Sequence, residues 1–408
     1  MPEHFIIVGA GQAAAQAVQT LRQKGFGGRI TIVGEERDPP YQRPPLSKKY
    51  LAGELARERL YVKPREFYAR RNIELELGMR AQRLEPSARR VVLQDGRALE
   101  YDGLMLATGS RVRKLAVPGA DLGGIHYVRT VADVDAIRDV FRSGKRLVGV
   151  GAGYIGLEVA AVAATGGLTV TVLEAAERVM ARVVCPEVSQ FYHRYHASAG
   201  VQIHCDTSVT AFTGEHRLEA VETSDGRRFP CDLAIVGIGV TPNVELAEAA
   251  GLECDDGIVV DEFARTANPS IVAAGDCTRH PSALAGHRIR LESVPNAIEQ
   301  AKTAALSLLG EPKAYATIPW FWSDQYDLKL QIAGLSAGHD RVVMRRETGD
   351  DHFSVFYLRS GTVVAVDAVN RPKDFLLGRK LIAAGAVVPP EDIADPGTDL
   401  AAVARAFG

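Results

Sequence analysis

The chain has 408 residues, 46% of them hydrophobic and 24% charged, which is enough for two or three domains with buried cores and excludes a disordered protein. A formal net charge of −2 gives the whole chain no attraction to nucleic acid or to an anionic membrane. No apolar run approaches the roughly 18 residues of a membrane helix, and residues 5–8 are predicted to be a strand rather than a signal peptide. We therefore expect no nucleic-acid partner and no membrane association.

The cysteines indicate the redox compartment. There are five of them, and none forms a C-x-x-C pair. An odd and scattered set is typical of reduced thiols rather than of a disulfide framework, so we expect a cytoplasmic protein. The cysteines are Cys185, Cys205, Cys231, Cys254 and Cys277.

A glycine-rich phosphate-binding motif occurs twice, each time directly after an apolar run. In both copies we expect a strand before the motif, a helix after it and a second strand that ends at an acid, as in a βαβ dinucleotide-binding unit. The positions are Gly9, Gly11, Ala14 and Glu35 in the first copy, and Gly151, Gly153, Gly156 and Glu174 in the second. Two copies predict two dinucleotides, and a flavin with a nicotinamide is the expected pair.

The residue types suit this chemistry. The first two glycines allow a tight turn and let the backbone approach a pyrophosphate, the small Ala14 permits close helix–strand packing, and a helix N-terminus offers unpaired N–H groups to phosphate. A carboxylate at Glu174 accepts a hydrogen bond from a free 2′-hydroxyl and repels a 2′-phosphate. No basic residue follows it until Arg178, which favours NADH over NADPH, although Arg178 and Arg182 could support some NADPH binding.

The remaining pattern predicts how the chain is divided. A strand near residues 271–276 resembles a return to the first domain, so the second domain is expected to be inserted in the first. From about Trp320 the pattern changes to short strands and one helix, followed by an alanine-rich tail at 395–408 that we expect to be loosely held. The expected elements are a helix at 11–24, strands at 5–8, 29–33, 104–109, 201–204, 233–236, 330–332, 341–344, 353–358 and 363–366, and a helix near 375–384. The expected domains are 1–112 and 241–317 for the flavin, 113–240 for the nicotinamide, and 318–408 at the C-terminus.

Three further segments are more specific than the glycine motifs. They are Arg43-Pro44-Pro45-Leu46-Ser47-Lys48, Glu292-Ser293-Val294-Pro295-Asn296-Ala297 and Pro319-Trp320-Phe321-Trp322-Ser323-Asp324-Gln325-Tyr326. With them the chain resembles, over nearly its whole length, the FAD-dependent NADH:ferredoxin reductases of cytochrome P450 and dioxygenase systems, the putidaredoxin reductase type. The resemblance implies an α/β fold with two Rossmann-like dinucleotide-binding domains, as in glutathione reductase, and a smaller C-terminal α+β domain.

The resemblance also implies the site residues. Ala81 would act through its backbone, Asp276 would bind the ribitol chain, and Val294 would begin a helix near the pyrimidine end of the flavin. The implied FAD residues are Gly9, Gly11, Ala13, Ala14, Glu35, Arg43, Lys48, Ala81, Arg129, Asp276, Val294 and Trp322. The implied NAD residues are Gly151, Gly153, Tyr154, Ile155, Gly156, Glu158, Glu174, Arg182 and Gly239.

The reaction centre is expected at three of these positions. The family places Lys48 close to the reactive face of the flavin with Glu158 nearby, and Tyr154 is expected to cover the flavin until the nicotinamide enters. We therefore expect Lys48, Glu158 and Tyr154 to be the catalytic residues, and we expect neither a metal ion nor an acid–base triad.

The implied function is the transfer of electrons from a two-electron donor to a one-electron acceptor. A hydride carries two electrons and an iron–sulfur cluster accepts one, so FAD would take hydride from NADH and pass single electrons to a [2Fe–2S] ferredoxin that supplies a cytochrome P450 or another oxygenase. Dithiol flavoprotein reductases carry a cysteine pair in the stretch equivalent to 38–49, and this chain has no cysteine there, which argues against disulfide chemistry. The alternatives are a reductase of rubredoxin, quinone or monodehydroascorbate, or a redox-regulated interaction flavoprotein of the apoptosis-inducing-factor type.

The partner is expected to be an acidic ferredoxin, and the protein itself a monomer or weak dimer. Trp322 is a candidate for the docking edge, and positive side chains around it would mainly accelerate the encounter. The candidate cations are Lys63, Lys302, Lys373, Arg379 and Lys380.

Overall fold

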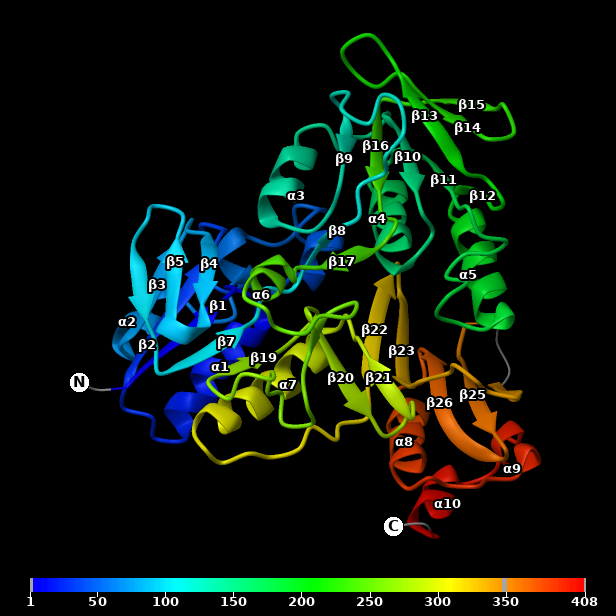
Figure 1. Cartoon of the computed structure of the whole chain (residues 1–408). Coiled ribbons are helices and arrows are strands. Elements are labelled where there is room, and N and C mark those ends of the chain that lie inside the picture. The colour runs from blue at the N-terminus through cyan, green and yellow to red at the C-terminus, as the bar shows by residue number, and fades with distance from the viewer. Residues whose placement is uncertain (1–2, 347–350, 407–408) are drawn as a thin grey trace. The chain divides into compact units, whose positions relative to one another are not determined.

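The computed structural model describes residues 3–346 and 351–406, which fall into two compact units (Figure 1). Unit 1 comprises Met1–Gln42, Arg57–Arg111 and Thr241–Phe321, and unit 2 comprises Arg43–Ala56, Val112–Val240 and Trp322–Gly408. The expected α/β fold class is confirmed by the parallel sheet in each unit. The expected domain boundaries stay a prediction, and the structure groups Arg43–Ala56 with unit 2 rather than with the first motif.

Unit 1 is built on a parallel sheet with the strand order β19-β7-β1-β2-β3. Val8 pairs with Val33 and Leu106, and Leu106 pairs with Ala273, so four of the strands end at one edge of the sheet. The strand near residue 271 therefore does return to the first sheet, as predicted. The strands are β1 (His4–Val8), β2 (Arg29–Gly34), β3 (Ile73–Leu77), β7 (Gly103–Leu106) and β19 (Ile271–Ala273).

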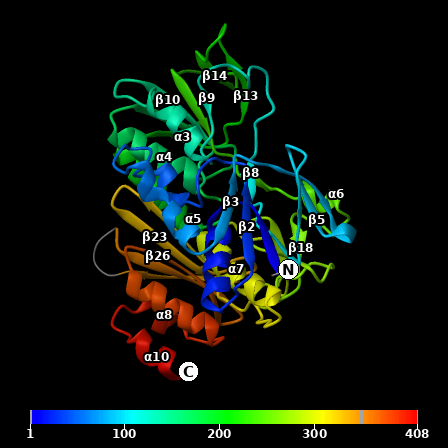
Figure 2. The same ribbon diagram turned by 90° about the vertical axis from the view of Figure 1, so that its left-hand side faces the viewer.

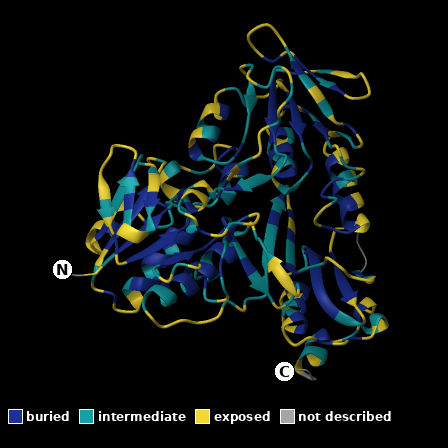
Figure 3. Cartoon of the chain, viewed as in Figure 1, coloured by how far each residue is buried: buried dark blue, intermediate teal, exposed yellow. Residues whose placement is uncertain are grey.

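The apolar run of β1 is explained by burial on both faces of this sheet. Phe5 and Ile7 belong to one buried core, and Ile6 and Val8 belong to the other. Side chains alternate between the two faces of a strand, and a parallel strand covered on both faces is apolar throughout. The buried strands β1, β7 and β19 of this sheet are accordingly mostly dark blue in Figure 3.

Helices α1 (Gln12–Gln23) and α7 (Val294–Leu308) pack against each other and share one core with the sheet. Small side chains make this close approach possible, because both helices contribute alanines. The helix predicted over 11–24 is one residue shorter at each end, since Gly11 is its N-cap and Lys24 its C-cap.

Shorter elements complete unit 1. The helices are α2 (Arg65–Arg70), α6 (Glu245–Ala249), η2 (Arg57–Leu60) and η3 (Pro86–Ala88). One antiparallel sheet contains β4 (Ala81–Glu85), β5 (Arg90–Leu93) and β6 (Ala98–Glu100). A mixed sheet contains β18 (Ile258–Val259), β20 (Thr278–Ser282) and β21 (His287–Ile289), in which β18 is parallel and β21 antiparallel to β20. The chain passes between the units at β8 (Ser110–Val112) and β17 (Val240–Pro242).

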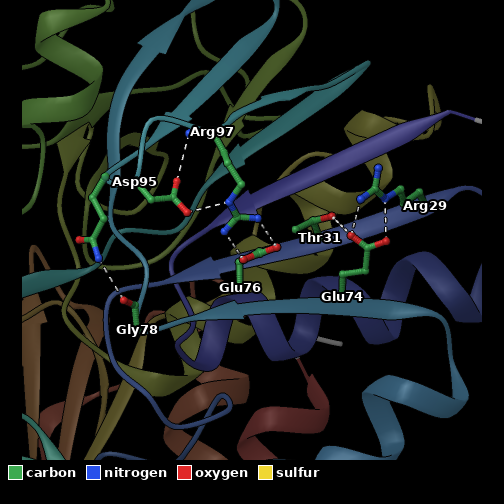
Figure 4. Close-up of polar contacts among 8 residues, drawn as sticks. Arg29, Thr31, Glu74, Glu76, Gly78, Asp95 and Arg97 are labelled. Carbon is green, nitrogen blue, oxygen red and sulfur yellow. Dashed lines mark hydrogen bonds and ion pairs between the residues drawn. The ribbon is translucent and has the colours of Figure 1, made fainter.

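Ion pairs cover the edge strand β3 (Figure 4). Arg29 donates to both carboxylate oxygens of Glu74, at 2.7 and 2.6 Å, and Arg97 donates to both oxygens of Glu76, at 3.0 and 2.9 Å. Arg97 also pairs with Asp95 at 2.7 Å. These guanidinium groups lower the pKa of Glu74 and Glu76. Charged side chains along an edge strand oppose pairing with a strand of another molecule.

Unit 2 contains a second parallel sheet with the order β12-β11-β10-β16-β9. Its strands are β9 (Ile125–His126), β10 (Arg146–Val150), β11 (Thr169–Leu173), β12 (Gln202–His204) and β16 (Leu233–Val236). Its helices are α3 (Val131–Arg138), α4 (Tyr154–Thr165) and α5 (Pro186–Ser198), with the short η1 (Pro44–Ser47) against α4. An antiparallel sheet of β13 (Val209–Thr213), β14 (Ala220–Thr223) and β15 (Arg228–Pro230) adjoins them.

The C-terminal part of the chain forms an antiparallel sheet with the order β22-β23-β26-β25-β24. Helix α8 lies on β23 and β26, and α10 lies on α8, as both views show (Figures 1 and 2). The expected α+β arrangement is confirmed, with longer strands than predicted. The elements are β22 (Trp320–Gln325), β23 (Leu328–Gly334), β24 (Arg341–Arg346), β25 (Phe353–Arg359), β26 (Thr362–Val369), α8 (Pro372–Ala383), α9 (Pro390–Ala394) and α10 (Leu400–Ala406).

The expectation of a loosely held tail is wrong for the described part of 395–408. The buried Arg345 donates to the backbone carbonyls of Asp395, Pro396 and Thr398, and Leu400 is only 2% exposed. The guanidinium group of this arginine in β24 thus donates several hydrogen bonds to backbone carbonyls of a turn that lies outside any helix. Residues 407–408 lie outside the described part of the chain.

Candidate functional site

The first glycine turn of unit 1 is shaped to receive a phosphate group. Gly9 has φ +113°, and a Cβ added to it would lie 2.0 Å from the carbonyl oxygen of Ala107, so only glycine fits there. A Cβ on Gly11 would meet no atom within 4 Å, so this face of the turn is open. Gly11 is also the N-cap of α1 without a side-chain cap, which leaves the N–H groups of the first helical turn for a ligand. Ala13 and Ala14 are buried behind the turn.

Other predicted flavin residues lie in the same unit. Glu35 follows β2 and is exposed at the edge where β1 also ends. Asp276 follows β19 and accepts a hydrogen bond of 2.8 Å from the hydroxyl of Ser110. Val294 is the first residue of α7, after the N-cap Ser293. Ala81 begins β4 and is partly exposed.

A buried amide near Asp276 has an unused donor. The side-chain oxygen of Gln300 accepts from the backbone N–H of Gly275 at 2.8 Å and from the hydroxyl of Thr278 at 2.8 Å. Its Nε2 atom is buried and has no hydrogen-bond partner among the residues that the structure describes. A bound polar cofactor would explain both the unpaired donor of Gln300 and the open face of the glycine turn. A turn that only closes a hydrophobic core would explain neither feature.

The second glycine turn, in unit 2, has the same construction. Gly151 has φ +99°, and a Cβ there would lie 2.6 Å from the carbonyl oxygen of Gly237. Gly153 is the uncapped N-cap of α4, and a Cβ on it would meet nothing within 4 Å. Gly156 is held against the turn, since its Cβ would lie 2.1 Å from the oxygen of Gly151. Ile155 is 41% exposed beside it.

The acid of the second motif is held by the backbone of the turn. Glu174 accepts from the N–H of Ala152 at 2.6 Å and from the N–H of Ala176 at 2.8 Å. Arg178, the nearest basic residue in sequence, donates to the carbonyls of Val184 and Ala181 at 2.8 and 2.9 Å. Its guanidinium therefore serves to close its own loop.

The segment from Glu174 to Arg182 returns to the second turn. The N–H of Met180 donates to the carbonyl of Ala152 at 2.9 Å, and a Cβ on Gly239 would lie 3.7 Å from Nη2 of Arg182. The structure thus brings Arg182 and Gly239 together in unit 2, as the predicted nicotinamide site requires.

A buried ion pair joins η1 to α4. Nζ of Lys48 lies 2.6 Å from Oε2 of Glu158, and the two side chains are 17% and 4% exposed. The same oxygen accepts from the hydroxyl of Ser47 at 2.5 Å, and Oε1 accepts from the hydroxyl of Ser323 at 2.7 Å. The two residues predicted for the reaction centre therefore form one cluster with two serines that the sequence reasoning missed. Both serines lie inside segments that it had singled out.

Further contacts tie the 43–56 segment to unit 2. Nη1 of Arg43 donates to the backbone carbonyl of Arg129 at 2.7 Å, which brings these two predicted flavin residues together. The hydroxyl of Tyr50 donates to Asp135 at 2.6 Å, and the guanidinium of Arg138 lies 5.1 Å from the centre of the Tyr50 ring. These bonds explain why the segment belongs with α3 and α4.

Tyr154 and Trp322 also belong to unit 2. Tyr154 is the first residue of α4 and Trp322 lies in β22, and both side chains are partly exposed. Burial and the neighbouring Asp367 raise the pKa of Tyr154, so its hydroxyl stays protonated at neutral pH.

The predicted docking cations are divided between the two units. Lys63 and Lys302 belong to unit 1, whereas Lys373, Arg379 and Lys380 lie on α8 in unit 2. Lys302 pairs with Glu299 at 2.7 Å. Leu376, on the same helix as the second group, is 55% exposed. Helix α8 thus presents three positive charges and an exposed apolar side chain.

None of the five cysteines is among the predicted site residues. All five cysteines are free, and burial raises the pKa of Cys185 to about 11 and that of Cys231 to about 12. Within 3–346 and 351–406, no group of three or more histidine, cysteine, aspartate and glutamate side chains is placed to hold a metal ion. No helix in the same ranges combines the length and the apolar character needed to cross a membrane.

Comparisons with known proteins cover the whole chain. Residues 3–301 match the family model described as pyridine nucleotide-disulphide oxidoreductase, and residues 320–404 match the model described as reductase C-terminal. The chain is 44% identical to putidaredoxin reductase of Pseudomonas putida over 404 residues, 98% of this chain and 96% of that protein. It is 43% identical to the ferredoxin–NAD(+) reductase component of the anthranilate 1,2-dioxygenase system of Burkholderia cepacia, over 97% of this chain and 98% of that one.

A solved structure agrees with these sequence matches. Putidaredoxin reductase in a covalent complex with putidaredoxin is similar to this chain with a TM-score of 0.96 and 43% identity, and the match covers 99% of both chains. The similarity therefore extends over both units and the C-terminal sheet.

Proposed function

The chain belongs to the putidaredoxin reductase type of ferredoxin reductases, within the pyridine nucleotide-disulphide oxidoreductase family, and from that premise we propose that it transfers electrons from NADH to a [2Fe–2S] ferredoxin. It is an oxidoreductase, and membership of the family implies that it uses FAD and a nicotinamide dinucleotide. The ferredoxin would supply a cytochrome P450 or another oxygenase. When bound, FAD would convert a two-electron donor into a source of single electrons.

We assign the flavin to the first glycine turn. The open face of Gly11, the uncapped N-terminus of α1 and the orphaned donor of Gln300 support this assignment. Gly9, Ala13, Ala14, Glu35, Ala81, Asp276 and Val294 would complete the set contributed by unit 1. Arg43, Lys48, Arg129 and Trp322, which belong to unit 2, stay part of the proposal through the family resemblance.

We assign NADH to the second glycine turn. Glu174 points a carboxylate at the backbone of this turn, where it would accept from the 2′-hydroxyl of a ribose. Arg178 is engaged with two backbone carbonyls, so it is a poor partner for a 2′-phosphate. Arg182 near Gly239 is the remaining positive group of this loop that the sequence reasoning named. The arrangement favours NADH over NADPH.

Lys48 and Glu158 would form the charged part of the reaction centre. An ammonium group held by a carboxylate at 2.6 Å keeps a fixed position. Glu158 orients Lys48, and Lys48 presents a positive charge toward the reacting groups. Tyr154, with its neutral hydroxyl, would serve as the cover that yields to an entering nicotinamide.

The partner surface is proposed on α8. Lys373, Arg379 and Lys380 give this helix a positive charge that would attract an acidic ferredoxin, and the exposed Leu376 offers an apolar contact. A cytoplasmic location also stays a proposal, supported by the five free thiols.

The observation that carries the proposal is the pair of open turns at Gly11 and Gly153, in a chain that matches ferredoxin reductases over nearly its whole length. The test measures cytochrome c reduction by the purified yellow protein with NADH, with and without added [2Fe–2S] ferredoxin. We expect ferredoxin to stimulate the rate. Reduction of quinone, rubredoxin or monodehydroascorbate without any stimulation by a ferredoxin would contradict the proposal and favour one of those acceptors.

A further inference from the structure

A row of buried polar side chains leads away from Glu158 into the interior of unit 2. It passes through Ser323 and Gln325 of β22, reaches His196 of α5 and ends at Tyr326. Ser323 and His196 are 0% exposed and Gln325 is 1% exposed. Groups this deeply buried are costly unless each one is hydrogen-bonded, so their order along the row is informative.

The row is continuous. The hydroxyl of Ser323 lies 2.7 Å from Oε1 of Glu158, and Nε2 of Gln325 lies 3.2 Å from the same hydroxyl. Oε1 of Gln325 lies 2.8 Å from Nε2 of His196, and the hydroxyl of Tyr326 lies 3.3 Å from Nδ1 of that ring. Each side chain therefore contacts the next through a polar atom.

The direction of these bonds follows from chemistry. Oε2 of Glu158 receives hydrogen bonds from the ammonium group of Lys48 at 2.6 Å and from the hydroxyl of Ser47 at 2.5 Å. A carboxylate only accepts, so Ser323 must donate its single proton to Oε1. Ser323 can then only accept from Gln325.

The same reasoning determines which ring nitrogen of His196 carries the proton. With the amide nitrogen of Gln325 turned to Ser323, its carbonyl oxygen faces His196 and must accept from Nε2–H. Burial lowers the pKa of His196 to about 4, so the ring is neutral at pH 7 and its Nδ1 carries no proton. Tyr326 donates to that nitrogen. Every donor in the row thus points toward Glu158.

We propose that Ser323, Gln325 and His196 are positioning residues that hold the Glu158 carboxylate toward Lys48. The ring nitrogen of His196 that carries the proton then depends on whether the group at position 158 accepts a hydrogen bond from Ser323 or donates one to it. This inference rests on the proposed role of the Lys48–Glu158 pair. None of the three residues is assigned a contact with substrate or cofactor. They act through Glu158.

The row has a second, reversed arrangement. If the group at Glu158 donates to Ser323, then Ser323 donates to Gln325, the amide turns over, and its nitrogen donates to Nε2 of His196. The imidazole proton then sits on Nδ1 and is donated to Tyr326. A carboxamide at position 158 favours this arrangement, because its NH2 group donates to Ser323 and frees the proton of that hydroxyl for Gln325, while its oxygen still accepts from Lys48 and Ser47.

Other ionisable groups lie near Glu158 and His196. Tyr154 and Tyr192 lie within electrostatic range of Glu158, and burial raises the pKa of both, so they stay neutral. Asp324 and Asp367 act on Tyr192, and His193 acts on His196. Lys48 is the cation that Glu158 contacts directly.

The test is 15N NMR of the full-length protein with its flavin bound, labelled at histidine and measured at pH 7. We expect the wild-type His196 ring to be protonated at Nε2, and Glu158→Gln to move that proton to Nδ1. His280, whose pKa burial also lowers to about 4, is assigned separately with His280→Gln. A wild-type ring protonated at Nδ1 would overturn the inference without any variant, and so would an unchanged tautomer in a folded Glu158→Gln protein.

A second measurement tests the positioning role. Ser323→Ala should slow anaerobic flavin reduction by NADH about tenfold, and Ser323→Thr, which keeps the hydroxyl, should restore most of the rate. Combined with Ser323→Ala, Glu158→Gln should no longer change the His196 tautomer. An unchanged rate in Ser323→Ala would refute the positioning role. The NMR measurement needs neither NADH nor ferredoxin. The His196 tautomer can therefore be determined even if the proposed function fails, and the two failures can be told apart.

Discussion

Lys48 lies 2.6 Å from Glu158 although the two residues are 110 positions apart in the chain and the carboxylate is almost fully buried. The contact is made because Pro44–Ser47 turns against α4 and presents the residue that follows it. Two serine hydroxyls also donate to the carboxylate, one to each oxygen. A buried ion pair of this kind is stable only while both partners and their hydrogen bonds are present.

Removal of the ammonium group should therefore destabilise the protein. Lys48→Met leaves a buried carboxylate without a counter-charge, and we expect the free energy of unfolding to fall by about 3 kcal/mol in urea titrations. Lys24→Met is the matched control, because Lys24 pairs with Glu311 at the surface, where the side chains are 49% and 56% exposed. It should change stability by less than about 1 kcal/mol. Equal effects of the two substitutions would show that the Lys48 pair is not buried in solution.

Coenzyme preference should depend on Glu174. Glu174→Ala removes the acceptor for a ribose hydroxyl, so kcat/KM for NADH should fall about tenfold while the ratio of NADPH to NADH efficiency rises. Glu177→Ala is the control, since its side chain is 79% exposed, and the ratio should stay as in the wild type. Comparable efficiencies with NADH and NADPH in the unaltered protein would contradict the assignment.

Stability should depend on pH through Asp367. Burial raises the pKa of this carboxyl to about 7, while the Tyr357 hydroxyl, which donates to it, opposes the shift. Because the folded pKa lies above the unfolded value, the folded state binds the extra proton, and this contribution is lost as pH rises from about 4 through about 7.

Replacement of Asp367 tests whether its contribution to stability is lost as pH rises. Asp367→Asn keeps an acceptor for Tyr357 and removes the charge, so it should raise the melting temperature at pH 8 and change it little at pH 4. The gain at pH 8 should be on the order of 3 kcal/mol. A variant that is less stable than the wild type at pH 8 would show that the folded protein prefers the ionised carboxyl.

The C-terminal segment should depend on Arg345. Arg345→Ala removes the donors that bind the carbonyls around Asp395 and Thr398, so hydrogen exchange of the amides between 398 and 405 should accelerate at least tenfold. Arg341→Ala, an exposed position on the same strand, should leave that exchange unchanged. Slow exchange in Arg345→Ala would mean that α10 is held by its packing on α8 alone.

Ferredoxin encounter should be sensitive to charge on α8. We expect KM for an acidic ferredoxin to rise about tenfold in Lys373→Glu/Lys380→Glu and to rise with ionic strength in the wild type. Lys313→Glu, an exposed site outside α8, is the control. Ferredoxin-dependent turnover that does not respond to salt would remove the steering role of this helix.

The parts of the fold that sequence reasoning predicted are those encoded locally. Gly9 and Gly151 were identifiable because a turn with positive φ next to a close carbonyl requires glycine at a fixed distance from a strand. The pairing of Lys48 with Glu158 came from family resemblance rather than from a pattern, since no local rule links residues 110 positions apart.

Other features depend on tertiary contacts that a single sequence does not express. Ser47 and Ser323 lay inside recognised segments, but nothing in those segments shows which hydroxyl faces a carboxylate. Arg345 lies just beyond the strand expected over 341–344, and the backbone carbonyls that it binds lie about 50 positions further on. The alanine-rich composition of the tail therefore predicted looseness where an arginine in β24 holds the backbone.

We propose above that this chain passes electrons from NADH to a [2Fe–2S] ferredoxin. The most direct measurement follows the visible absorbance of a purified ferredoxin under anaerobic conditions, with catalytic amounts of the protein and a known amount of NADH. A hydride supplies two electrons and each cluster accepts one, so we expect two ferredoxins to be reduced for each NADH consumed. NADH consumption without reduction of any ferredoxin in a panel from P450 and dioxygenase systems would contradict it.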